Sequence, residues 1–281
     1  MRLLAACVWL VGGLIGLCAD PPHDAGARGA LAAAIDAPAR AGVRAARAIT
    51  YTNFLPVIGK LRDCAPVGET YGAVTILSAP TNPPAETHPD INLTLRGFVP
   101  TTGTLGLIPG INPVDTSAPQ LAGLFGDQRV PTFTAVYQVY DWDWANNRRG
   151  ALLITPTVTL AGMGVAPGEV IRVPASGYDI GLRPTGYEVM VLYATATRLT
   201  LKYTREDNVV FGYTLHLENI CVDPYLLGAY QTLNAAGRAQ LPALTAGQGV
   251  GRALTTTLGV AIRDTGTFMD PRWRDDWWQG R

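Results

Sequence analysis

Residues 187–220 read YEVMVLYATATRLTLKYTREDNVVFGYTLHLENI, and they decide the predicted fold class. The stretch is rich in Val, Leu, Thr and Tyr, and polar turn residues divide it into three apolar runs. In the middle run, RLTLKY at 198–203, apolar and polar side chains alternate with the period of a strand. Three such runs at close spacing predict short antiparallel strands.

Strand patterns continue on both sides of this stretch. Residues 132–160 (TFTAVYQVYDWDWANNRRGALLITPTVTL) predict a strand at 132–144, a turn at 145–150 and a second strand at 151–160. Further strands are predicted at 72–77 (GAVTIL), 91–99 (INLTLRGFV), 168–173 (GEVIRV) and 259–264 (GVAIRD). A helix is predicted at 223–240, because Asp223-Pro224 suits a helix start and Gly237 a helix end.

These patterns predict a mainly β protein. We expect an antiparallel, sandwich-like C-terminal domain, a smaller β-rich N-terminal region and one or two short helices. The expected divisions are a signal peptide at 1–19, an Ala/Arg/Pro-rich tether at 20–48, the N-terminal region at 49–165 and the C-terminal domain at 166–281.

The first residues indicate export. Met1-Arg2 is followed by the uncharged apolar run LLAACVWLVGGLIGL at 3–17, with a small residue, Ala19, at the expected cleavage point. The run is short for a membrane span, although a retained anchor is the alternative. Leu17 before Cys18 does not suit a lipidation site. We therefore expect a secreted or extracytoplasmic protein, associated with a membrane only if the leader is retained.

The remaining cysteines fit an oxidising compartment. Cys64 and Cys221 form an even pair outside the leader and predict one disulfide, with two buried thiols as the alternative. The charge composition indicates that nucleic acid is not a partner. The chain has 22 basic and 22 acidic residues and no basic stripe, so we expect no binding to nucleic acid.

The C-terminal half carries an ordered series of short motifs. Gly177-Tyr178-Asp179-Ile180 precedes a Pro184-Thr185-Gly186 turn, and Leu215-His216-Leu217 follows further along. The series ends with the turn GQGVG at 247–251, the strand LGVAIR at 258–263 and Asp270-Pro271. This order resembles the lysostaphin-like (LytM-type) zinc peptidases, over about 105 residues.

The resemblance places Asp179 on the aspartate ligand of that family and His216 on the histidine of its H-L pair. The other ligand positions differ: Ala175 stands where the first histidine is expected, and Thr257 and Gly259 replace the H-x-H pair. A catalytic zinc site needs three protein ligands, so the resemblance implies a degenerate domain with no metal and no catalytic residues. Asp179 and His216 are then expected to line a binding groove.

Aromatic residues give a second candidate binding surface. Tyr140, Trp142 and Trp144 alternate along one predicted strand and could stack on sugar rings, although such a row also suits a sheet core. The tail holds three more tryptophans, at 273, 277 and 278, which we expect to fold back onto the protein.

The leading functional hypothesis is an exported, non-catalytic binding or scaffold protein of the cell wall or envelope. Peptidoglycan, another glycan or an envelope protein is the expected partner, and no cofactor is expected. The alternatives are a metal-dependent cell-wall hydrolase with a non-standard site and a purely structural surface protein.

Overall fold

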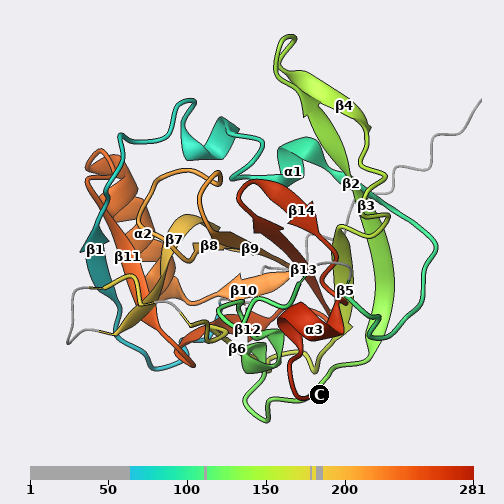
Figure 1. Ribbon diagram of the computed structural model, residues 1–281. Helices are drawn as coiled ribbons and strands as arrows, with labels where there is room; N and C mark the ends of the chain where they lie inside the picture. The colour runs from blue at the N-terminus through green and yellow to red at the C-terminus, as the bar shows by residue number, and fades with distance from the viewer. Residues whose placement is uncertain (1–63, 111–112, 178, 182–185) are drawn as a thin grey trace, which may run out of the picture. The chain divides into compact units, whose positions relative to one another are not determined.

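The computed structural model describes residues 64–110, 113–177, 179–181 and 186–281 (Figure 1). These residues belong to one unit, Pro56–Arg281. The predicted signal peptide and tether lie outside the described residues.

Eleven of the described strands form one antiparallel sheet. Nine of them lie side by side in the order β1 (Gly72–Thr75), β11 (Gln240–Thr245), β7 (Tyr187–Thr195), β8 (Arg198–Lys202), β9 (Tyr213–Glu218), β13 (Thr257–Asp264), β5 (Leu160–Gly164), β3 (Phe133–Asp143) and β2 (Phe98–Pro100). Two short strands extend it: β14 (Thr267–Met269) pairs with β13, and β4 (Arg148–Leu152) pairs with β3.

A second sheet and several short helices complete the described part. The second sheet has the order β10 (Ile220–Val222), β12 (Gly249–Ala253) and β6 (Val170–Arg172). The helices are the 3-10 turns η1 (Ala85–Thr87) and η2 (Leu121–Leu124) and the α-helices α1 (Leu93–Arg96), α2 (Pro224–Ala235) and α3 (Arg274–Trp277). The predicted fold class, mainly β with antiparallel sheets and few helices, is confirmed.

Strands from the two predicted regions share the large sheet. β5, from the N-terminal region, lies between β3 and β13, and β1 pairs with β11 from the C-terminal half. The expected boundary at residues 165 and 166 therefore does not separate two sheets. Each region completes the hydrogen bonding of the other.

The central strands are buried on both faces. On β8, Leu199 and Leu201 face one way and Thr200 and Lys202 the other, as the alternation predicts, and all four are buried. The polar face would normally meet water. Here the hydroxyl of Thr200 donates to the carbonyl of Ile91, so the segment around residue 91 lies over this face. We call residues 88–97 the covering segment.

One predicted strand is wrong in its first half. Residues 93–96 form the single turn of α1, and only 98–100 form a strand. Leu93 and Arg96 are both buried, because a helical turn brings residues three apart onto one face. Gly97, at φ 70°, then redirects the chain into β2. The second arm of the predicted hairpin is also different: β4 covers only 148–152, and the next strand, β5, begins at Leu160.

The structure contains the predicted helix, and its tail folds back onto the protein as expected. The carboxylate of Asp223 accepts from the backbone N–H groups of Tyr225 and Leu226 at the start of α2. The three tail tryptophans are buried. The indole N–H groups of Trp277 and Trp278 donate to the carbonyls of Asp270 and Pro271, at 2.8 and 2.9 Å.

The predicted disulfide joins Cys64 to Cys221, with 5.5 Å between the Cα atoms. It holds one end of residues 64–71, which we call the strap. Arg252 donates to the carbonyls of Ala65 and Pro66, and Gln248 donates to that of Thr70. The strap is thus fastened to the β12 side of the protein before the chain enters β1.

Among the described helices, none is both long enough and apolar enough to cross a lipid bilayer.

Candidate functional site

His216 lies in the middle of the large sheet, and only 1% of its surface is exposed. On β9 it pairs with Thr200 of β8 and Ala261 of β13. Its Nδ1 atom is 3.2 Å from the Thr200 hydroxyl, which donates to the Ile91 carbonyl at 2.9 Å. Because the Thr200 proton is used in that bond, His216 Nδ1 is the donor to Thr200. Burial lowers the pKa of His216 to about 3, so the imidazole is neutral.

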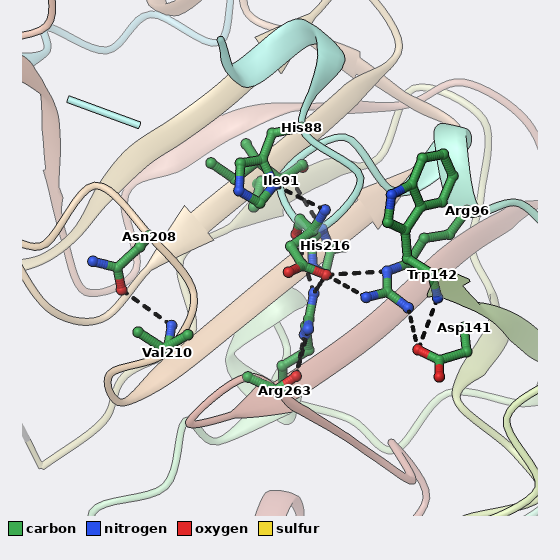
Figure 2. A network of polar contacts seen from close by, with 12 residues as sticks. His88, Ile91, Arg96, Asp141, Trp142, Asn208, Val210, His216 and Arg263 are labelled. Carbon is green, nitrogen blue, oxygen red and sulfur yellow. Dashed lines mark hydrogen bonds and ion pairs between the residues drawn. The ribbon is translucent and has the colours of Figure 1, made fainter. Parts of the chain in front are cut away.

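An ion cluster holds the covering segment over His216 (Figure 2). Asp90 Oδ1 accepts from Arg96 at 2.5 and 3.0 Å and from Arg263 of β13 at 2.9 Å. Arg263 Nη1 also donates to the Asp90 carbonyl at 3.2 Å. One carboxylate therefore joins the covering segment to the centre of the sheet.

The charges of this cluster compensate one another. Burial opposes ionisation of Asp90, but Arg263 and Arg96 outweigh it and lower the pKa of the carboxyl. Burial lowers the pKa of Arg263, against the attraction of Asp90. The cluster is stable as a unit, because removing one member would leave an uncompensated buried charge.

The cluster continues to the base of the β3–β4 hairpin. Arg96 Nη1 donates to the Tyr140 carbonyl at 3.1 Å and to Asp141 Oδ1 at 3.2 Å. The Phe268 ring lies beside both guanidiniums, with its centroid 4.5 Å from Arg263 Cζ and 5.7 Å from Arg96 Cζ. It also stacks on His216. Aromatic and cationic groups thus fill the space that an open groove would occupy.

Three polar atoms on this face of the sheet are buried and have no hydrogen-bond partner among the described residues. They are His216 Nε2, Thr214 Oγ1 and Lys202 Nζ, and Thr214 pairs with Lys202 across β8 and β9. Burial lowers the pKa of Lys202 to about 8, although Glu206 acts in the opposite direction. Burial of the charged Lys202 ammonium therefore lowers the stability of the folded protein at neutral pH.

Asp179 does not share the environment of His216. Its carboxylate is exposed and accepts from the Gly181 backbone N–H at 2.9 Å. The charged groups that act on His216 are Arg263, Asp90 and Arg96, whereas Asp179 acts on Glu188. The expectation that His216 lines a groove is corrected by its burial under the covering segment.

The other positions of the zinc-peptidase pattern are also occupied by structural contacts. A Cβ at Gly259 would lie 3.0 Å from the Glu218 Cβ, so a larger side chain there requires Glu218 to move. The Thr257 hydroxyl lies 3.2 Å from that of Thr134. In the described ranges, no three His, Cys, Asp or Glu side chains are grouped so that they could hold a metal ion.

The aromatic row lies on β3 but does not form one flat face. The pairing of β3 with β4 shifts register between Tyr140 and Trp142, which interrupts the regular alternation. Tyr140 and Trp142 are half-buried, and the Arg149 guanidinium lies 4.9 Å from the Tyr140 ring. Trp144, just beyond β3, is 52% exposed and meets His88 edge-on. Trp144 is therefore the most exposed ring of the row.

The residues that organise this region were not predicted from the sequence. Asp90 and Arg96 flank a segment that resembles a strand, and nothing in the sequence links them to Arg263. One signal was present: Arg263 follows four apolar or small residues in GVAIRD, and a charge inside a buried strand needs a partner.

No protein-family model, curated protein or solved structure matched this chain.

Replacing Asp90 with Asn should destabilise the protein by about 3–5 kcal/mol, because two buried guanidiniums lose their counter-ion. Asp141→Asn is the matched control. It contacts the same Arg96, but its side chain is 60% exposed, so we expect a loss below about 1 kcal/mol. Urea unfolding at pH 7 measures both losses. Equal losses for the two variants would contradict the assigned role of Asp90.

Replacing Lys202 with Met should stabilise the protein by about 2 kcal/mol at pH 7. Folding favours the neutral amine, so the cost is full below the folded pKa of about 8 and declines as pH rises toward the unfolded value of 10.5. Urea unfolding of both proteins at pH 7 and pH 10 should show a smaller gain at pH 10. An equal gain at both values would assign the effect to packing instead of charge.

Proposed function

We propose that this chain is an exported, non-catalytic binding or scaffold protein of the cell envelope. The observation that carries the proposal is the burial of His216 beneath the covering segment. A general base or metal ligand must reach the substrate or the metal-bound water. His216 meets Thr200 and Phe268 instead, and its neutral ring is held by a hydrogen bond that supports the fold.

The surroundings of the other pattern positions support the same proposal. Gly259 is packed against Glu218. The Asp179 carboxylate accepts a hydrogen bond within a local turn, and Asp179 is not among the charged groups that act on His216. Converting this region into a hydrolytic centre would require the Asp90 ion cluster to open. That step is costly, because separating the three charged groups leaves buried charges without a counter-ion.

Export is supported by the disulfide. Cys64 and Cys221 are far apart in sequence, and their bond joins the strap to β10. Such bonds persist in oxidising compartments and are rare in the reducing cytosol. Together with the apolar leader, this favours a location outside the cytoplasm.

Metal content and hydrolysis test the proposal together. The purified protein is dialysed against trace zinc, analysed for bound metal and incubated with purified peptidoglycan. We expect far less than one zinc per chain and no release of soluble fragments. His216→Ala and Asp179→Ala serve as matched variants.

About one zinc per chain that is lost in both variants, or hydrolysis that depends on either residue, would overturn the non-catalytic proposal. Metal that binds equally to the parent and both variants would belong to another site and would not carry a peptidase function here.

A further inference from the structure

The strap forms a ridge between two open cavities, and the first of them is also lined by Gly247 and Gln248 of the GQGVG turn. One cavity, of about 590 Å³, lies between the strap, Tyr187 and the turn at Gln248. The other, of about 490 Å³, lies between the strap and α2 at Tyr225. Glu69, Thr70 and Tyr71 line both cavities, so the two spaces adjoin across three residues.

The ridge is held in place by contacts on its inner side. The Tyr71 hydroxyl donates to the Gly249 carbonyl at 3.0 Å, and Glu69 Oε1 accepts from the Gly249 N–H at 3.2 Å. Gln248 Nε2 donates to the Thr70 carbonyl at 2.8 Å. These bonds fix the ridge to the start of β12 before any ligand arrives, which reduces the entropy lost on binding.

Each cavity has a tyrosine of its own in addition to Tyr71. Tyr225 lies in the first turn of α2, with 65% of its surface exposed. Tyr187 lies across Gly72, where an added Cβ would collide with its hydroxyl. Because residue 72 is a glycine and has no side chain, the Tyr187 ring can pack directly over it. Flat rings of this kind give apolar area at low entropic cost and keep a polar end.

Polar groups on the ridge remain available to a ligand. Glu69 uses Oε1 for the backbone, and no hydrogen bond of its second carboxylate oxygen is found in the described part of the chain. Thr70 is exposed. None of the described residues that line the two cavities is Lys or Arg. The described lining therefore offers acceptors and hydroxyls, and the neighbouring Arg172 guanidinium donates to the Gly247 carbonyl at 2.9 Å. This lining does not favour a phosphate or a polyanion.

We propose that the two cavities are adjacent subsites for an uncharged oligosaccharide. The size of each cavity suits a small ligand unit, and each supplies an aromatic ring together with hydrogen-bonding groups. The shared ridge lies between successive sugar rings, with Glu69 and Thr70 contacting their hydroxyls. This inference rests on the proposed function, because it names the ligand class of a non-catalytic envelope protein.

Calorimetric titration of the purified protein with N-acetylglucosamine tetramer and with cellotetraose tests the inference. We expect at least one of these neutral sugars to bind, and Tyr225→Ala to weaken that binding about tenfold. Tyr225 is mostly exposed, so this variant should keep the unfolding midpoint of the parent. Tyr187→Ala probes the other cavity and should also weaken binding.

Phe211→Ala is the matched control, because Phe211 is also a largely exposed aromatic residue but lies between β8 and β9 and lines neither cavity. We expect it to bind sugar like the parent. Binding lost in Trp144→Ala and kept in Tyr225→Ala would overturn the inference in favour of the hairpin. Failure of both sugars to bind would also overturn it.

The outcomes separate the two proposals. A protein that binds no sugar, holds no zinc and cleaves no peptidoglycan contradicts the oligosaccharide site and leaves the non-catalytic proposal intact. Cleavage that depends on His216, with sugar binding that depends on Tyr225, contradicts the non-catalytic proposal and leaves the oligosaccharide site intact.

Discussion

The carboxylate of Asp90 joins the covering segment to the middle of the large sheet. It accepts hydrogen bonds from Arg96 of the covering segment and from Arg263 of β13. Arg96 and Arg263 lie far apart in the sequence. The three side chains are nearly shielded from water, so the charges are tolerable only together. The position of the covering segment, and with it the burial of His216, depends on this arrangement.

This arrangement explains why a polar sheet face exists without a solvent-filled groove. Thr200 and His216 are satisfied in part by each other and by the Ile91 carbonyl, and Phe268 fills the space beside the guanidiniums. The Lys202 ammonium, which has no hydrogen-bond partner among the described residues, destabilises the fold at neutral pH. Open cavities lie instead along the strap, where the disulfide and Arg252 hold a non-strand segment against β12.

Much of the fold could be predicted because local patterns determine it. The alternation in RLTLKY, the Asp223-Pro224 helix start and the apolar tail each depend on neighbouring residues. The candidate site could not be predicted in the same way. Residues 91–99 have the composition of a strand, yet Leu93 and Arg96 lie in a helical turn. Arg96 of that turn binds the Asp90 carboxylate, which Arg263 of β13, far away in the sequence, also binds. Whether His216 is exposed likewise depends on residues more than a hundred positions away.

Imidazole NMR of His216 tests the central claim most directly, with His216→Gln used to assign its signals. Burial and the Thr200 hydrogen bond predict a neutral ring protonated on Nδ1, whose nitrogen shifts stay constant from pH 7.5 to pH 4.5, above its pKa of about 3. A signal that titrates with a midpoint near the ordinary value of about 6.5 would show a solvated ring. That result would contradict the burial of His216 beneath the covering segment.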